Sequence, residues 1–241
     1  MIILSNVDTL VEGLPELDIF IEPKGIDEFR LYKDLLKEWN EKINITAIKE
    51  DNEIDIKHFL DSLTIFKTDK IKDNTKIIDI GTGGGFPGIP IKIKNKTTEV
   101  VLLDSLNKRI KFLNEVINKL NLKDIKAIHG RAEEFGSDKE YREQFDIAVS
   151  RAVAPLNILL EYSLPFVKKG GYFISMKGPQ IYEEIEESKK ALKILGGEIE
   201  EKFEVKLPLS DITHVLLVIK KIKQTPTKYP RKAGKPKQKP L

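Results

Sequence analysis

From Thr75 onward, short runs rich in β-branched residues alternate with amphipathic stretches of helical length, and this alternation restricts the possible folds more than any other feature. The runs that we expect to be strands are Lys76–Ile80, Glu99–Leu103, Ile125–Ile128, Phe145–Val149 and Tyr172–Met176. The intervening stretches that we expect to be helices are Pro87–Lys94, Asn107–Leu120, Pro155–Phe166 and Gln180–Leu195. Because such strand–helix–strand units cross over in one direction, they predict a doubly wound, mostly parallel α/β sheet.

Two further runs, Glu198–Leu207 and His214–Ile222, are expected to be the last strands. A short stretch rich in turn residues joins them, which indicates a hairpin. The sheet is therefore expected to end in an antiparallel hairpin rather than in another parallel strand.

The chain is expected to consist of three regions. Apolar residues recur at helical spacing within 27–40 and 51–66, so we interpret residues 1–70 as a helical N-terminal extension. Residues 71–223 form the α/β domain. Residues 224–241 contain four prolines, which argue against a helix or a central strand, and we expect an extended, mobile, basic tail.

A glycine-rich loop follows the first predicted strand. Its sequence after Ile80 is GTGGGFPG, and five of these eight residues are glycine. Glycine lets a ligand approach the backbone closely, because no Cβ intervenes and positive φ angles cost little. The helix that follows begins with unpaired N–H groups, which suit an anionic group. The loop is therefore the first candidate for a cofactor site.

Two motifs overlap in this loop. The pattern D-x-G-x-G-x-G, starting at Asp79, resembles the first motif of S-adenosylmethionine enzymes, whereas G-x-G-x-x-G, starting at Gly83, matches the dinucleotide fingerprint. Pro87 removes an N–H donor that a pyrophosphate would need, and Phe86 places a large ring at the point of close approach. Together with the closing hairpin, these details favour S-adenosylmethionine. The candidate cofactor contacts in this motif are Asp79, Gly81, Gly83 and Gly85.

Polar residues follow the next strands, and ligands of doubly wound sheets bind beyond the carboxyl ends of the strands. Asp104 ends the second strand and can accept hydrogen bonds from both ribose hydroxyls, a role compatible with capping the next helix. After the third strand, Ala132 and Glu133 can offer a backbone N–H and a carboxylate to adenine, although Glu133 also suits a solvated helical turn. Arg151 after the fourth strand and Lys177 after the fifth put two cations on the same rim.

Composition excludes several kinds of site. The chain has no cysteine, which rules out disulfides and thiol nucleophiles, and its three histidines lack ligand spacing, so we expect no metal site. We interpret His58 and Trp39 as core residues of the helical extension. Neither a signal peptide nor a run of the ~20 apolar residues that a membrane helix needs is evident, so we expect a cytoplasmic protein without a membrane partner.

Charge is distributed unevenly along the chain. From Lys220 to Leu241 there are eight lysines, one arginine and no acidic residue, so this segment carries +9. Because the whole chain carries +3, the remainder carries −6 (3 − 9). Such a basic tail attracts phosphate groups without regard to sequence, and with Tyr229 and Arg231 in it we expect contact with RNA.

Several segments, spread in order over nearly the whole chain, occur together in one known family. They are Trp39–Ile48, His58–Leu63, Asp79–Pro90, Leu103–Ser105 with Lys108–Arg109, Arg131–Glu133, Ser150–Ala152, Lys177–Gly178, Tyr229–Gly234 and Pro240–Leu241. On these segments the chain resembles the ribosomal RNA small subunit methyltransferase G family, formerly called glucose-inhibited division protein B.

The resemblance implies a bacterial enzyme that transfers a methyl group from S-adenosylmethionine to N7 of one guanine in the 530-loop region of 16S rRNA. The cofactor contacts that it implies are Gly81, Phe86, Ala132, Glu133 and Arg151. The substrate-side catalytic residues that it implies are Arg131, Arg151 and Lys177. The implied partner is 16S rRNA or the small ribosomal subunit, and we expect a monomer.

The chemistry of guanine N7 agrees with this site. N7 carries a lone pair and no proton, so no general base is needed, and none stands on the predicted rim. Because the methylated base is positively charged, we expect Arg or Lys to hold guanine O6 or a phosphate instead of N7. The alternatives are methylation of another RNA or of a small molecule, a dinucleotide-dependent oxidoreductase, and a catalytically idle RNA-binding module.

Overall fold

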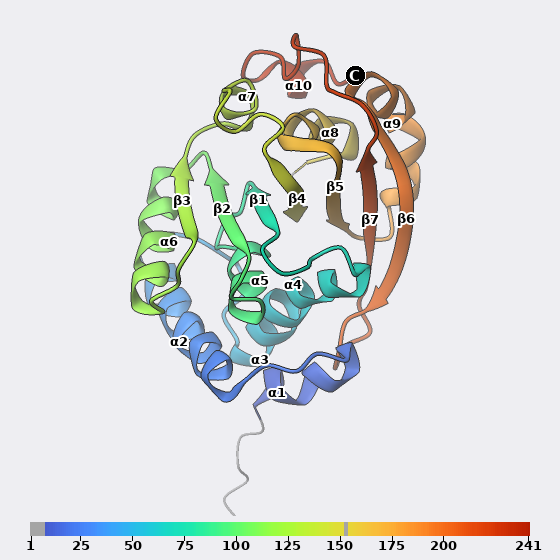
Figure 1. Cartoon of the computed structure of the whole chain (residues 1–241). Helices are drawn as coiled ribbons and strands as arrows, with labels where there is room; N and C mark the ends of the chain where they lie inside the picture. The colour runs from blue at the N-terminus through green and yellow to red at the C-terminus, as the bar shows by residue number, and fades with distance from the viewer. Residues whose placement is uncertain (1–7, 152–153) are drawn as a thin grey trace, which may run out of the picture.

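A seven-stranded sheet with the order β3-β2-β1-β4-β5-β7-β6 forms the centre of the computed structural model, which describes residues 8–151 and 154–241 (Figure 1). Residues 1–7 and 152–153, which include Ala152 of the segment Ser150–Ala152, lie outside this description. The strands are β1 (Lys76–Ile80), β2 (Glu99–Asp104), β3 (Ile125–His129), β4 (Phe145–Arg151), β5 (Val167–Lys177), β6 (Gly197–Lys206) and β7 (Thr213–Lys221).

The direction of the strands confirms the predicted fold class. Neighbours among β1 to β5 pair in parallel, whereas β7 pairs antiparallel with both β5 and β6. The strand order reverses between β1 and β4, and ligands of doubly wound sheets bind at such a switch point. The sheet therefore places any ligand site at the carboxyl ends of β1, β2 and β4.

Helices precede the sheet and connect its strands. Before β1 these are α1 (Thr9–Gly13), η1 (Leu14–Leu17), α2 (Pro23–Asn40), α3 (Asp51–Ile54), η2 (Asp55–Leu60), α4 (Asp61–Leu63) and η3 (Thr64–Thr68). The later ones are α5 (Gly88–Lys94), α6 (Asn107–Lys119), α7 (Ala132–Phe135), α8 (Leu156–Ser163), η4 (Leu164–Phe166), α9 (Ile181–Leu195) and α10 (Lys235–Gln238). Among the described residues, no helix is both long and apolar enough to cross a membrane.

Two hydrophobic cores cover the two faces of the sheet, because successive strand residues point to opposite sides. Ile77 belongs to the core that the N-terminal helices, α5 and α6 complete, together with Phe112. Its neighbour Ile78 belongs to the other core, which contains Leu159 of α8 and the Tyr229 ring. The N-terminal extension thus forms one layer of the fold and is not a separate unit.

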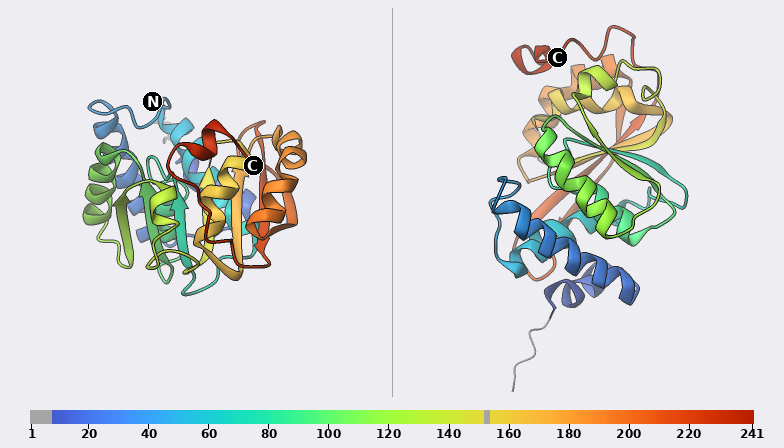
Figure 2. Two further views of the ribbon diagram at one scale, coloured as in Figure 1. Left: turned by 90° about the horizontal axis from the view of Figure 1, so that it is seen from above. Right: turned by 90° about the vertical axis from the view of Figure 1, so that its left-hand side faces the viewer.

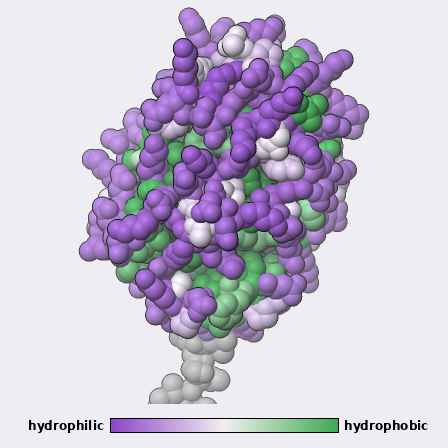
Figure 3. Space-filling view, in the orientation of Figure 1, coloured by the Kyte–Doolittle hydropathy of each residue, from purple (hydrophilic) through white to green (hydrophobic). Residues whose placement is uncertain are grey.

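The N-terminal helices and the C-terminal segment (residues 224–241) lie at opposite ends of the molecule (Figures 1 and 2). In the view of Figure 3, the end that carries the C-terminal segment is covered mostly by hydrophilic side chains. α2 begins at Pro23, whose missing N–H would have no partner in a first turn, and it buries Phe29 and Leu36.

The C-terminal segment is packed on the domain and contains a helix, so the expectation of an extended tail without a helix is wrong. Tyr229 is buried in a core, and the Arg142 guanidinium donates to the carbonyls of Thr225 and Tyr229, each at 2.7 Å. α10 tolerates Pro236 because proline stands in its first turn, where no N–H partner is required. The number of prolines indicates neither the burial of Tyr229 nor the position of Pro236 in a first turn.

Candidate functional site

The buried side chain of Asp79 anchors the loop that follows β1. Its Oδ2 accepts hydrogen bonds from the Thr82 hydroxyl at 2.7 Å and from the Gly88 N–H at 2.9 Å. Burial raises the pKa of Asp79 to about 7, although these two hydrogen bonds act to lower it. Asp79 therefore fixes the turn from the loop into α5.

Two glycines of this loop occupy places that a larger residue would not tolerate. Gly83 has a φ of 61°, and its N–H donates to Asp104 Oδ2 at 2.9 Å. Gly85 has a φ of 97°, and a Cβ there would lie 2.7 Å from the Tyr32 hydroxyl. Tyr32 of α2 is buried and donates its O–H to the carbonyl of Gly84. The N-terminal extension therefore supports the loop directly.

Two cavities open beside the loop, and both include Gly81, Asp104 and Ser105 in their walls. The first is completed by Ile80, Leu103, Gly130, Arg131, Ala132, Glu133, Tyr162, Gly234 and Lys237. The second is completed by Ile45, Thr46, His58, Thr82, Gly83, Gly84, Phe86, Arg109 and Arg151. The two cavities thus meet at the carboxyl ends of β1 and β2, where doubly wound sheets bind their ligands.

Asp104 lies between the two cavities and is almost fully buried. It accepts hydrogen bonds from the N–H groups of Gly83 and Leu106, each at 2.9 Å, and from the Arg109 guanidinium at 3.2 Å. An ionised carboxylate has about four acceptor positions, so about one is free for a ribose hydroxyl. The second ribose bond expected from the sequence requires Arg109 to move away.

An aromatic and cationic stack forms one wall of the second cavity. The His58 ring lies 4.5 Å from the Phe86 ring, with 17° between their planes. The Arg151 guanidinium carbon lies 5.0 Å from the centre of the same Phe86 ring, a favourable cation–π distance. His58 belongs to the π-helical turn η2, a conformation that often marks functional sites. The stack presents a flat, partly cationic surface beside the glycine loop.

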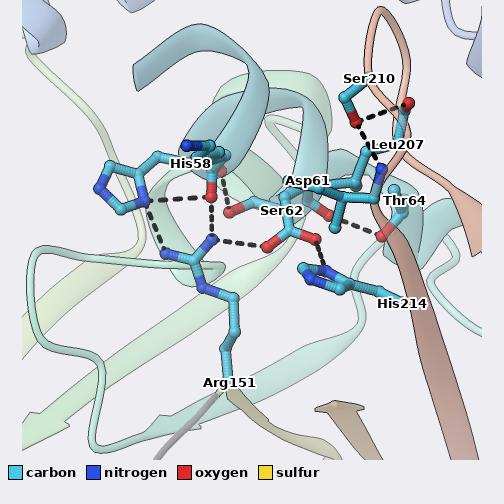
Figure 4. Close-up of polar contacts among 10 residues, drawn as sticks. His58, Asp61, Ser62, Thr64, Arg151, Leu207, Ser210 and His214 are labelled. Carbon is cyan, nitrogen blue, oxygen red and sulfur yellow. Dashed lines mark hydrogen bonds and ion pairs between the residues drawn. The ribbon is translucent and has the colours of Figure 1, made fainter. Parts of the chain in front are cut away.

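Arg151 is held in place by a network that reaches from β4 to η2 and α4 (Figure 4). One of its terminal nitrogens donates to Asp61 Oδ2 at 2.7 Å and to the Lys57 carbonyl at 2.8 Å. The other lies 3.1 Å from His58 Nδ1. Asp61 Oδ1 is 2.7 Å from Nδ1 of His214 on β7, so one carboxylate joins the ends of two strands.

The neighbours of His58 settle its protonation. Burial, and after it the charge of Arg151, lowers the pKa of His58 to about 4, so the ring is neutral near pH 7. Because Arg151 can only donate, Nδ1 accepts, and the proton is on Nε2, which lies 2.8 Å from the Thr46 hydroxyl. The 3.1 Å approach of Nδ1 to the Lys57 carbonyl is then a close contact and not a hydrogen bond.

Asp61 is buried and remains ionised. Burial acts to raise its pKa, but the hydrogen bond from His214 and the charge of Arg151 together hold the pKa of Asp61 below its ordinary value. Its buried negative charge lies next to the Arg151 cation, whose side chain is 15% exposed. Arg151 is therefore fixed in position and electrically compensated.

The structure separates the three cations that the resemblance implies as catalytic. Arg151 lines the second cavity, whereas Arg131 lines the first and is exposed. Lys177 pairs with Glu184 of α9 at 2.7 Å, donates to the Ala154 carbonyl at 2.6 Å, and is absent from the walls of both cavities formed by the described residues.

Sequence reasoning did not find several residues of the site. His58 was predicted to be a core residue; it is buried, but it also lines the second cavity. The roles of Asp61, His214 and Tyr32 depend on contacts between distant segments, which helical periodicity does not reveal. The available signal was that His58 and Asp61 lie in one segment carrying the family resemblance.

Several solved structures share this fold at low sequence identity. TYW2 of M. jannaschii in complex with AdoMet matches with a TM-score of 0.52 at 20% identity, over 67% of this chain and 77% of that one. TrmN from Thermus thermophilus matches with a TM-score of 0.52 at 14% identity, over 67% of this chain and 48% of that one. Together with the strand order, these likenesses show the fold class, a doubly wound α/β sheet that ends in an antiparallel hairpin.

The comparison of sequences is more specific. A family model described as rRNA small subunit methyltransferase G matches residues 25–210. Relatives named ribosomal RNA small subunit methyltransferase G include one from Thermoanaerobacter sp. (strain X514), 59% identical over 98% of this chain and 99% of its own length. Another, from Clostridium tetani, is 53% identical over 99% of this chain and 100% of its own length. The chain belongs to the rRNA small subunit methyltransferase G family, which confirms the predicted family, enzyme class and cofactor.

Proposed function

We propose that the protein transfers the methyl group of S-adenosylmethionine to N7 of a guanine in the 530-loop region of 16S rRNA. The observation that carries the proposal is the pair of cavities that meet at Gly81 and Asp104. One has a ribose acceptor and an apolar wall, and the other has an aromatic and cationic wall. Membership of the family supports the RNA substrate.

The walls of the first cavity fit the adenosine part of the cofactor. Asp104 keeps about one acceptor position for ribose, Leu103 and Ala132 supply apolar surface for adenine, and Glu133 supplies a carboxylate. When bound, S-adenosylmethionine supplies an electrophilic methyl group on a positively charged sulfur. The proposed cofactor contacts on the cavity walls are Gly81, Gly83, Phe86, Asp104, Ala132, Glu133 and Arg151. Two further proposed residues, Asp79 and Gly85, would act by shaping the loop.

The second cavity suits a base that needs no proton removed. His58 is neutral and uses both ring nitrogens, toward Thr46 and Arg151, so it is not available as a general base. Arg151 has five N–H groups, and after its three bonds about two are free to hold guanine O6 or a phosphate. Because Asp61 compensates its charge, Arg151 can approach a base that becomes positive with less repulsion.

The other two cations have supporting roles in the proposal. Arg131 is exposed at the edge of the first cavity, where it can contact an RNA phosphate. Lys177 pairs with Glu184 and must leave it to reach the substrate. We therefore propose that Lys177 contacts the RNA only after the RNA has bound, and does not take part in its initial attraction to the surface. We also propose that the enzyme is a monomer in the cytoplasm, which sedimentation analysis and cell fractionation test.

The test is transfer of a labelled methyl group to small ribosomal subunits and to naked 16S rRNA that lack the modification. The proposal expects the label in 7-methylguanosine at one position of the 530 loop. Label in a different nucleoside or a different RNA would support another RNA substrate. If only a small molecule accepts the label while RNA does not, the RNA function is refuted.

A further inference from the structure

Residues 229–241 of the C-terminal segment form part of the wall of the first cavity. Gly234 and Lys237 line it together with Ala132 and Glu133. The Gly234 N–H donates to Glu133 Oε1 at 3.0 Å, across 101 positions of the sequence. In Figure 1 this segment runs over the end of the molecule that carries α7 and α8. The segment that we expected to be an extended, mobile tail thus contacts Glu133, a residue that we propose binds the cofactor.

This contact is built into the fold, because the segment is anchored on both sides of it. Before Gly234, the backbone N–H of Arg231 donates to Glu161 Oε1 at 2.8 Å, and its guanidinium pairs with Glu161 Oε2 at 2.5 Å. Glu161 is completely buried, so this charge pair is expensive to break. After Gly234, Pro236 is buried, and Leu241 packs against the core of that face.

The contact fixes the direction of the Glu133 carboxylate. The Gly234 N–H takes one of its roughly four acceptor positions, so other positions can accept from a ligand. Lys237 is exposed, yet it borders the cavity, so its aliphatic stem can cover an apolar ligand while the ammonium group stays in water. Both features act on a ligand without requiring RNA.

We propose that residues 229–241 are a structural wall of the cofactor cavity, in which Gly234 positions Glu133 and Lys237 covers the adenosine part of S-adenosylmethionine. This inference rests on the proposed function, because it takes the first cavity as the cofactor site. Exposed lysines elsewhere in the segment remain available to RNA, so the wall adds to the phosphate attraction expected from the sequence.

Two matched lysine variants test the proposal. Lys237→Ala and Lys239→Ala remove the same charge from the same exposed segment, but only Lys237 lines the cavity. Isothermal titration of the full-length variants with S-adenosylmethionine, without RNA, should show a Kd raised about threefold or more by Lys237→Ala and unchanged by Lys239→Ala. Equal Kd values for both variants and the parent would overturn the role of Lys237.

A chain that ends after Ala233 tests the wall as a whole, since it keeps the Arg231–Glu161 pair and loses Gly234. We expect its Kd for the cofactor to rise at least tenfold, or about 1.4 kcal/mol. Its KM for the cofactor should rise as well, because the same wall is lost. An unchanged Kd in a shortened chain with a cooperative melting transition would refute the wall. Failure of the full-length parent to methylate any RNA, while the shortened chain shows the raised Kd, would refute the RNA function alone.

Discussion

Substituting Asp61 with asparagine removes the charge that holds Arg151, and we expect a large loss of stability. Asp61 is 1% exposed and accepts from both Arg151 and His214 at 2.7 Å. Asparagine has nearly the same shape, and His214 can change tautomer to accept from its amide NH2, but the neutral amide leaves the charge of Arg151 uncompensated. Breaking a buried charge pair by changing one partner typically costs about 3–5 kcal/mol. We take about 3 kcal/mol as the expected loss, because the amide oxygen keeps one hydrogen bond.

Urea unfolding at pH 7 measures this loss, and a thermal scan should show a melting temperature lower by roughly 6–12 °C, at about 2–4 °C per kcal/mol for a chain of this size. Asp51→Asn is the matched control, because Asp51 pairs with Lys37 on the exposed surface of the same helical stretch. Exposed pairs contribute under about 1 kcal/mol, so this control should stay close to the parent. Equal losses in the two variants would refute the reasoning.

Acid should reduce the difference between the parent and Asp61→Asn. The pKa of Asp61 is lowered in the folded state, so its contribution is complete above the unfolded value of about 4. It is lost as the pH falls through the lower folded value. The two proteins should therefore become more alike in stability below about pH 4, whereas a difference that stays constant would show that charge is not the cause.

Three other variants test the site. Arg151→Ala should lower kcat about 100-fold, with a smaller change in cofactor Kd, because a fixed hydrogen-bond donor is lost. Single-turnover kinetics on small ribosomal subunits measure this rate, and an unchanged rate would show that Arg151 does not belong to the site. His58 has a folded pKa of about 4, below its ordinary 6.5, so its contribution is complete above pH 6.5 and about 3 kcal/mol is lost as the pH falls to 4. His58→Gln should flatten that part of the stability curve measured by urea unfolding, and an equally steep curve would contradict the low pKa. Tyr32→Phe should raise the cofactor KM and reduce stability by about 1 kcal/mol, since the loop loses the hydrogen bond to Gly84; wild-type values for both would show that the bond does not shape the loop.

Most of the fold could be predicted because it depends on local patterns. Each expected strand exists, and the first, Lys76–Ile80, has the predicted bounds. Buried parallel strands give continuous apolar runs, and their helices give a clear amphipathic period, so both signals are strong in one sequence. The boundaries between extension, domain and tail, placed at 70/71 and 223/224, remain our proposal.

The expectation of an extended, mobile tail was wrong because composition does not reveal whether a segment packs against the rest of the fold. The charge and prolines of the tail are those of a flexible linker, but one buried aromatic ring and one pair with a buried carboxylate are enough to fix it. Tyr229 and Arg231 were noted for possible contact with RNA. In the structure Tyr229 packs in a core and Arg231 binds Glu161, 70 positions earlier.

The sequence indicates which candidate site residues follow the strands of the sheet, but not which of them contact one another. Gly83 and Asp104 could be placed at strand ends because parallel strands end at one edge of a sheet. The link from Arg151 to His58 spans 93 positions and depends on how η2 packs over β4, which no local pattern encodes. In the same way, the pairing of Lys177 with Glu184 depends on the angle at which α9 leaves the sheet.

The central claim is that a single edge of the sheet holds the cofactor in one cavity and the guanine in the next. A crystal structure of the protein with S-adenosylmethionine tests this most directly. We predict the ribose at Asp104, the adenine between Ala132 and the C-terminal segment, and the methyl group directed toward the cavity of Phe86 and Arg151. Density for the cofactor away from Asp104, or a methyl group directed away from Phe86, would contradict the account.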